Sequence, residues 1–305
     1  MNINKSQLNK FINLIKADYA NFEIKSFKPL KSGWDNFAIE INKLYIFRFP
    51  KKKDIDLKKE INILKQINGK MTLQIPVYEF IGKKSPYVGY KRIEGQPLTI
   101  NTLKSLSLKN RRRLVSDIAN FFYEFHKFLP VTQAKKLGVE IAKHEWEPKI
   151  IKKRVIGKLK NKDLSDFLKY NLDKYLTFIN IKSDLAIVYN DFHEENIAFN
   201  RNGGRLIGVF DFSDAAVSNV YMEFYRLYAF DKKLTIEVLK EYEQLSGRLI
   251  DLNKVFISAV VGVGAELGFY SLHPNSKEYI NSLKNLMTLK RDNLNLTSTR
   301  IFAPA

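Results

Sequence analysis

A polar stretch between two short apolar runs, IVYNDFHEENIAFN at residues 187–200, carries side chains that are suited to phosphate chemistry. Asp191 is followed five residues later by Asn196, and a second acid, Asp211, closes the β-rich run of the segment LIGVFDFSD. A loop carboxylate can accept the proton of an acceptor hydroxyl, and amide and carboxylate oxygens are ligands that Mg²⁺ prefers. The pattern therefore predicts phosphoryl transfer from a nucleotide, with Asp191 as the catalytic base and Asn196 and Asp211 as metal ligands.

Two short strands beside the polar stretch would bring these three side chains together. The apolar runs at residues 197–199 and 206–210 are separated by NRNGG, which is a strong turn signal. A hairpin of these runs places Asp191, Asn196 and Asp211 at the same end of a two-stranded ribbon. The alternative is a surface hairpin with ordinary turn-forming Asp and Asn, and the FDFSD segment after the hairpin argues against it.

The first ninety or so residues have the pattern of a small antiparallel sheet. The runs NFAIEI and LYIFRFP are separated by Asn42 and Lys43, which is a hairpin signal, and IPVYEFIG and YVGYKRI are two further strand candidates. The segment between these pairs has helical spacing, with apolar residues at Leu57, Ile61, Leu64 and Ile67. The N-terminal part is therefore predicted to be a sheet with one helix.

After the Gly-Gln-Pro sequence at residues 95–97, helical spacing dominates. Ser107 can cap a long helix, and further helices are predicted near residues 235–245 and 252–270 and after Pro274. We therefore predict an α+β fold with two lobes. Residues 1–94 form a nucleotide-binding lobe with a hinge at 91–95, and residues 95–305 form a larger, mainly helical lobe that carries the short hairpin.

Composition favours a packed globular protein. The chain has 305 residues, of which 45% are hydrophobic and 13% aromatic, and this composition argues against disorder. No continuous apolar run reaches the roughly 18 residues of a membrane span. The absence of Cys excludes disulfides and thiolate metal sites. The first twenty residues lack the apolar stretch of a secretory signal, so a cytoplasmic protein is expected.

The net charge is strongly positive, at +19 from 51 Lys and Arg against 32 Asp and Glu. Such an excess can attract nucleic acid, phosphorylated ligands or anionic surfaces. However, the basic residues are spread along the whole length, and the clusters KKKD, KNRRR and KIIKKR are not interleaved with the aromatic residues that stack nucleic-acid bases. We therefore expect a solvated basic surface rather than a nucleic-acid partner. The sequence does not specify an oligomeric state.

The segments VYNDFHEENI and GVFDFSDA resemble the catalytic and metal segments of the aminoglycoside phosphotransferase and choline kinase family, which has a protein-kinase-like fold. The likeness extends upstream in the same order through SGWDNFAIEINKLYIFRFP, KEINILKQI, IPVYEFIG and YKRIEGQPLT, and covers about residues 30–227. It is closest to enzymes that modify the 2″-hydroxyl of aminoglycosides. The resemblance implies a Mg²⁺-dependent kinase that transfers the γ-phosphate of ATP or GTP to a small-molecule hydroxyl.

The resemblance also implies a nucleotide site, whose members are Ser32, Gly33, Asn36, Arg48, Glu60, Lys91 and Ile93. The loop that ends at Asn36 would cover the phosphates. Arg48, where the family usually has Lys, would donate to the phosphates and pair with Glu60 on the following helix. Backbone groups near Lys91 and Ile93 would hold the base.

Two further positions depart from the family pattern. Tyr189 stands where a His is usual, and Ser213 replaces a Gly in the metal segment. The usual His is largely structural, and Tyr can also hydrogen-bond to backbone nearby. Neither departure removes a chemical group that the reaction requires.

The acceptor side is less well specified. In the family, carboxylates line this side, and the candidates here are the carboxylates Glu194, Glu195, Asp214 and Glu223. His193, which stands beside Asp191, is a further candidate. A net charge of +19 repels a polycation at long range, although local carboxylates act within a Debye length of about 8 Å. An aminoglycoside, a sugar, an amino alcohol and another metabolite therefore all remain open as acceptors.

Two function classes other than a small-molecule kinase also remain. The chain could be a nucleotide-binding pseudokinase, and the intact Asp191, Asn196 and Asp211 argue against this alternative. It could also be a basic nucleic-acid-binding protein on a kinase scaffold, which salt-dependent binding to a random duplex would reveal.

Overall fold

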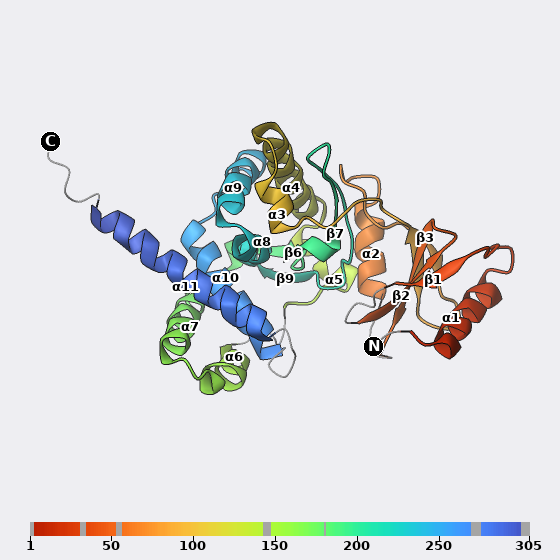
Figure 1. The fold of residues 1–305 in the computed structure, drawn as a ribbon, viewed down its shortest axis with the longest axis horizontal. Helices are drawn as coiled ribbons and strands as arrows, with labels where there is room; N and C mark the ends of the chain where they lie inside the picture. Colours follow the sequence, from red (N-terminus) through yellow and green to blue (C-terminus); the bar gives the residue numbers. More distant parts are fainter. Residues whose placement is uncertain are drawn as a thin grey trace.

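Figure 1 shows a two-lobed molecule, with a small sheet lobe in red to orange beside a larger helical lobe. The structure is a computed structural model that describes residues 3–30, 35–52, 57–142, 148–179, 181–269 and 276–299. The predicted α+β, kinase-like fold class is confirmed by this architecture. The predicted division at residues 94 and 95 stays a prediction.

The small lobe is built on a five-stranded antiparallel sheet with the strand order β1-β2-β3-β5-β4. Asn42 and Lys43 have positive φ angles of 55° and 56°, which the two central residues of a tight hairpin turn adopt, and the Leu44 N–H closes the turn on the Ile41 carbonyl at 3.1 Å. The four predicted strands are confirmed and β1 is an addition. The strands are β1 Phe27–Pro29, β2 Asn36–Ile41, β3 Tyr45–Pro50, β4 Tyr78–Ile81 and β5 Val88–Lys91.

Two helices accompany this sheet, where the sequence analysis expected one. The predicted helix is α2 (Lys58–Ile67), and the additional helix is α1 (Lys5–Asp18). The start of α1 is fixed by a capping box in which the Asn4 and Gln7 side chains bond each other's backbone N–H. The apolar face of α1 packs on the sheet, whereas that of α2 belongs to the core of the helical lobe. In Figure 1, α2 stands between the sheet and the helical lobe.

The large lobe is mainly helical, as predicted. Ser107 caps the long helix that the sequence indicated, because its side chain accepts a hydrogen bond from the Asn110 backbone N–H. The α-helices in the described part of this lobe are α3 Ile100–Lys104, α4 Leu108–Phe128, α5 Ala134–Leu137, α6 Pro148–Arg154, α7 Lys162–Tyr175, α8 Tyr225–Phe230, α9 Lys232–Ser246, α10 Leu252–Phe269 and α11 Ser276–Thr299.

Helix α10 is the apolar centre of this lobe. By length and composition alone its 18 residues could cross a membrane, but 67% of that window is buried inside the protein. Its glycines allow close packing: a methyl group at Gly262 would lie 2.4 Å from the Tyr225 ring, and one at Gly264 would lie 2.7 Å from Leu168. The helix therefore packs as a core helix between α7 and α8.

Two short ribbons, rather than the single predicted hairpin, carry the polar segments. The predicted hairpin is present as β7 (Ile197–Asn200) paired with β8 (Arg205–Val209). A second antiparallel pair, β6 (Leu185–Val188) with β9 (Ala216–Asn219), was not predicted. Strand β6 leads directly into Asp191, and β9 begins two residues after Asp214. The pairing of β6 with β9 therefore brings the two polar segments together.

Backbone hydrogen bonds tie one edge of the β7–β8 ribbon to Gln96, just after the predicted hinge, and the other edge to Gln74 of the small lobe. Gln96 and Phe199 exchange backbone hydrogen bonds of 3.0 and 2.9 Å. Gln74, in the connection between α2 and β4, bonds to the other edge through Ile207 and Val209, at 3.0 Å each. At this second contact a methyl group on Gly208 would lie 2.7 Å from the Gln74 carbonyl oxygen, so only Gly fits. These contacts fix the small lobe over the polar segments.

Candidate active site

The loop after β6 holds Asp191 and Asn196 against each other. Asn190 has a left-handed φ of 71°, which Asn adopts more readily than most non-Gly residues. Asn196 follows a turn closed by its own N–H to the His193 carbonyl at 3.0 Å. Its Nδ2 donates to Asp191 Oδ2 at 2.5 Å and to the Asp191 carbonyl at 3.1 Å. The five-residue spacing therefore closes a compact loop, and the predicted proximity of the two side chains is found.

Asp211, at the end of the second ribbon strand, is held by a cation from the small lobe. Asp211 Oδ1 accepts hydrogen bonds from Arg48 Nη2 at 2.9 Å and from Ser213 Oγ at 2.8 Å. Arg48 Nη1 donates to Glu60 Oε1, also at 2.9 Å. The planar fork of Arg can hold two carboxylates at once, which suits this position better than the point charge of Lys. The predicted Arg48–Glu60 pair is present, and it reaches Asp211 as well.

Neighbouring charges shift the pKa values of Asp211 and Asp214. Burial works to raise the pKa of Asp211, but the Arg48 guanidinium and the hydrogen bonds from Ser213 hold that pKa below its ordinary value. The pKa of Asp214 is raised to about 7 by desolvation and by the negative charges of Asp191 and Asp211. Since the Asp214 side chain remains exposed to solvent, repulsion by the two neighbouring carboxylates is the firmer cause. Asp191, Asp211 and Asp214 thus form one acidic cluster.

The remaining nucleotide candidates fall in three places. Ser32 and Gly33 lie outside the described residues. Asn36, at the start of β2, is 8% exposed, and its side-chain oxygen has no hydrogen-bond partner in the described part of the protein. A buried polar atom without a partner is what a ligand-binding position can show before its ligand is present. Lys91 and Ile93 lie at and just after the end of β5.

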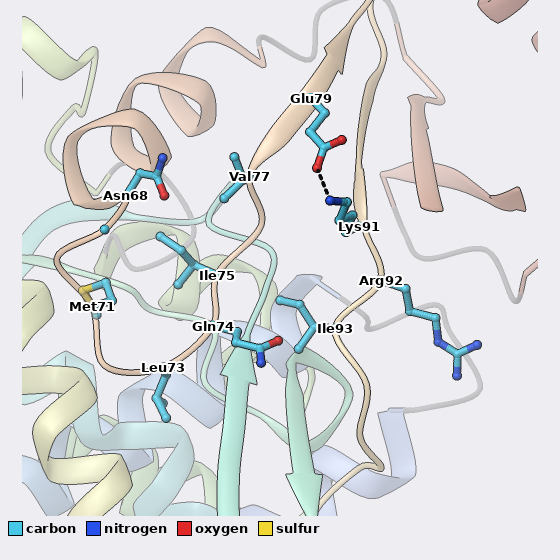
Figure 2. A pocket seen from close by; sticks show the side chains of 11 residues that line it. Asn68, Met71, Leu73, Gln74, Ile75, Val77, Glu79, Lys91, Arg92 and Ile93 are labelled. Carbon is cyan, nitrogen blue, oxygen red and sulfur yellow. Dashed lines mark ion pairs between the residues drawn. The ribbon is translucent and has the colours of Figure 1, made fainter. Parts of the chain in front are cut away.

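Figure 2 shows a hollow of about 400 Å³ between the α2–β4 connection and the chain that leaves β5. Its wall includes the side chains of Lys91 and Ile93, and Lys91 forms a 3.5 Å ion pair with Glu79 there. None of the residues of the acidic cluster lines this hollow. The Lys91 side chain therefore lies away from the acidic cluster. This placement leaves the backbone groups of the segment for the predicted contact with the nucleotide base.

Glu223 corrects one prediction for the acceptor side. Its side chain is fully buried under the loop of Asp191, where it accepts hydrogen bonds from Tyr189 N–H at 2.8 Å and Asn190 N–H at 3.4 Å and contacts His126 Nε2 at 2.9 Å. A carboxylate so enclosed cannot contact an acceptor. Glu223 instead fixes the backbone that carries Asp191, and the prediction that it binds the acceptor is wrong.

Glu223→Ala is expected to lower the free energy of unfolding by about 3 kcal/mol, because it leaves two buried N–H groups and His126 without their partner. Urea denaturation followed by circular dichroism measures this difference. Glu223→Gln is the matched control, since its amide oxygen still accepts one of the hydrogen bonds, and the loss should be smaller. An Ala variant within about 0.5 kcal/mol of the wild type would contradict this role.

Other residues of the catalytic segments have mixed roles. Tyr189 Oη donates to the Phe210 carbonyl at 2.6 Å, so Tyr does hydrogen-bond to backbone as expected. His193 Nδ1 accepts from the Glu195 N–H at 3.2 Å, and His193 Nε2 lies 3.5 Å from Asp191 Oδ2. Glu194 and Glu195 are exposed. His193 therefore shapes the loop and also lies beside the Asp191 carboxylate.

The predicted site residues did not include two residues that contact this site. Arg226 Nη2 lies 3.0 Å from Asp191 Oδ1, and the same nitrogen contacts Glu266 of α10. Arg226 falls in an aromatic series with the spacing of a core helix, which hid its role. Glu266 did carry a signal, because it is the only acid in the apolar α10, and a carboxylate in such a helix needs a partner.

The side-chain oxygens of Asn196 and Asp211 fit a hard metal ion. Asn196 uses its Nδ2 for Asp191, which leaves its Oδ1 as an available acceptor, and Asp211 Oδ1 accepts from Arg48 and from the Ser213 hydroxyl. In the described residues, no three His, Cys, Asp or Glu side chains gather as a metal cage. Mg²⁺ is usually bound by one or two carboxylates plus the phosphates of the substrate, so a smaller donor set is adequate.

Comparison with known proteins identifies the family. Residues 26–255 match the phosphotransferase enzyme family. The GDP complex of an aminoglycoside 2′-phosphotransferase-IIIa point mutant is similar with a TM-score of 0.78 and 25% identity, over 94% of this chain and 98% of that chain. The GDP and kanamycin complex of APH(2")-IIia has a TM-score of 0.74 and 24% identity, over 94% of this chain and 99% of that chain. Macrolide 2′-phosphotransferase type I shares the fold, with a TM-score of 0.66 and 14% identity over 93% and 98%. Because the family match covers most of its length, the chain belongs to the phosphotransferase enzyme family.

Proposed function

We propose that the chain is a Mg²⁺-dependent kinase that transfers the γ-phosphate of ATP or GTP to a hydroxyl group of a small molecule. The observation that carries this proposal is the pair of polar groups in which Asn196 bonds Asp191 and Arg48 joins Glu60 to Asp211. Relatives bound to GDP, and the streptomycin-ATP complex of APH(2")-IIa, support a nucleoside triphosphate as the donor.

In the proposed reaction, the acceptor oxygen forms a bond to the γ-phosphorus while the bond from the γ-phosphorus to the bridging oxygen breaks. The hydroxyl proton passes to Asp191, and the nucleoside diphosphate leaves with the bridging oxygen. Arg48, oriented by Glu60, donates to the phosphates. The loop of Ser32, Gly33 and Asn36 covers the phosphates, and backbone groups near Lys91 and Ile93 hold the base.

Asn196 Oδ1 and Asp211 would hold the metal ion. When bound, Mg²⁺ neutralises charge on the phosphate oxygens and aligns the γ-phosphate. The chain contributes the rest: Nδ2 of Asn196 keeps Asp191 in place, and Ser213 and Arg48 keep Asp211 in place.

The acidic residues of α9 favour a neutral acceptor over a polycation. Glu237 is paired with Arg111 at 2.7 Å, Glu241 accepts from the Ser116 hydroxyl, and Glu243 accepts from the backbone N–H that follows α9 at residue 250. None of these three contacts involves Asp191 or the other residues of the acidic cluster. The cation closest to Asp191 is Arg226. We therefore propose a neutral hydroxyl compound, such as a sugar, although kanamycin, gentamicin and streptomycin are bound by relatives.

Nucleoside diphosphate formation from ATP and GTP, measured against sugars, amino alcohols, kanamycin and gentamicin, tests the proposal. At saturating nucleotide, kcat/KM for a neutral acceptor should stay flat between about 20 and 200 mM salt, a range over which the Debye length shrinks about threefold. A polycation should instead react faster as salt screens the +19 field. A clear rise with kanamycin, together with its loss in Glu194→Ala or Asp214→Ala, would show that local carboxylates decide the acceptor.

A further inference from the structure

A charged side chain from outside the catalytic loop contacts Asp191. Arg226, in the short helix α8, places Nη2 3.0 Å from Asp191 Oδ1 and donates from the same nitrogen to Glu266 Oε1. Its Nε donates to the Asn190 carbonyl at 3.4 Å. One guanidinium thus joins the side chain of Asp191 and the backbone before it to α10, which packs beside α8 (Figure 1).

The partner of Arg226 is costly to bury. The Glu266 side chain is 9% exposed, and the Arg226 side chain is 23% exposed. Tyr225 Oη also donates to Glu266 Oε1, at 3.0 Å. Apolar side chains of similar volume often stabilise a core as well as a buried ion pair does. Packing of α10 therefore does not by itself require this charge, whereas holding Arg226 in one orientation does.

The contacts on Asp191 come from two directions. Its Oδ2 accepts from Asn196 Nδ2, within its own loop, and its Oδ1 is held by Arg226, from the helical lobe. The loop is also anchored from below by Glu223. Without Arg226, the carboxylate would depend on its Oδ2, which Asn196 Nδ2 and His193 Nε2 contact. With it, both carboxylate oxygens are held, and Oδ1 is tied to the helical lobe.

We propose that Arg226, braced by Glu266, is a positioning residue that sets the orientation of the Asp191 carboxylate toward the acceptor hydroxyl. This inference rests on the proposed function of Asp191. Arg226 itself takes no proton and acts through the Asp191 carboxylate that it contacts. A misplacement of a reacting group by about 1 Å can lower a rate by about 10²-fold, so a clamp on both oxygens has a measurable effect on kcat.

The test compares kcat with nucleotide affinity in Arg226→Ala, Arg226→Lys, Glu266→Gln and Glu266→Ala. The rate of ADP and GDP formation is measured with water and with a panel of neutral sugars as acceptors, and nucleotide affinity is measured by calorimetry with Mg²⁺. The matched control is Arg111→Ala, because Arg111 forms a comparable pair with Glu237, at 2.7 Å, between α4 and α9. A purely structural loss should affect the stability of Arg111→Ala and Arg226→Ala alike.

Arg226→Ala should lower kcat by about 30- to 100-fold and leave nucleotide affinity within about twofold. Arg226→Lys should recover part of the rate, because one ammonium cannot hold Asp191 and Glu266 with the same fork geometry. Glu266→Gln should lower kcat by less than Arg226→Ala. The double variant Arg226→Ala with Glu266→Ala should be no slower than Arg226→Ala, since the two residues act as one unit. Arg111→Ala should keep its kcat.

Retention of kcat within about threefold in a folded Arg226→Ala protein would overturn the inference, as would an equal loss in Arg111→Ala. If Arg226→Ala does not fold, the rates of Arg226→Lys and Glu266→Gln decide in the same way. Asp191→Asn is measured in parallel. If Asp191→Asn keeps its activity, the proposed function fails. If it loses activity while all Arg226 and Glu266 variants keep theirs, only the positioning role fails.

Discussion

Asp191→Asn is expected to lower kcat for phosphoryl transfer by about 10²- to 10⁴-fold, the range for loss of a positioned general base. The substitution keeps the size of the side chain but removes the charge that accepts the hydroxyl proton. The fold should survive, because the backbone of this loop is held independently by Glu223. Nucleotide affinity should stay near that of the wild type, since no contact assigned to the nucleotide is removed. Single-turnover rates, circular dichroism and nucleotide titration measure the three properties.

The control for Asp191 is its neighbour His193, the other group of the loop that could take a proton. His193 Nε2 lies 3.5 Å from Asp191 Oδ2, so geometry alone does not separate the two. His193→Gln keeps an acceptor oxygen for the Glu195 N–H that His193 Nδ1 now bonds, and should lower kcat far less. If Asp191→Asn retained more than about a third of the wild-type kcat while His193→Gln lost its activity, the base would be His193.

The parts of the fold that were predicted correctly have local signals. The β2–β3 turn at Asn42 and Lys43, the cap of α4 at Ser107 and the NRNGG turn of the β7–β8 ribbon each depend on residues within a few positions of one another. Turn and cap chemistry is decided by such neighbours. The resemblance to the aminoglycoside phosphotransferase family is likewise carried by short ordered segments, and the family match over residues 26–255 confirms it.

The parts that were missed depend on distant partners. Strand β6 is recognisable as a strand only through β9, which pairs with it about thirty residues later along the chain. Glu223 stands in the apolar run VYMEFY, and only the fold reveals that its carboxylate lies under Tyr189 and Asn190. Arg226 and Glu266 are forty residues apart, and neither indicates the other in the sequence. Helix α1, by contrast, was not predicted although the capping box at Asn4 and Gln7 is a local signal.

Asp211→Ala is expected to abolish the Mg²⁺ dependence of nucleotide binding, whereas Asn196→Ala should only weaken it. A carboxylate brings a full negative charge to the metal ion, and an amide oxygen brings only a dipole. Because changes to residues that merely support a ligand already cost about 10- to 100-fold in metal affinity, loss of Asp211 should cost at least as much. Calorimetric titration of ATP and GTP with Mg²⁺ and with a chelator measures the difference. Asp211→Ala should bind with the affinity that the wild type shows in the chelator.

Loss of Asp211 also frees one arm of Arg48, so the experiment needs a control for the broken ion pair. Arg48 would retain Glu60 at 2.9 Å, which keeps its charge paired. Asp117→Ala is the matched control, because it removes a buried carboxylate that pairs with Arg205 at 2.8 Å in the helical lobe. It should reduce stability but leave the effect of Mg²⁺ on nucleotide affinity intact. If the wild type, Asp211→Ala and Asn196→Ala all bound nucleotide equally and independently of Mg²⁺, neither residue would be a metal ligand, and the charge of Asp211 would serve only to hold Arg48.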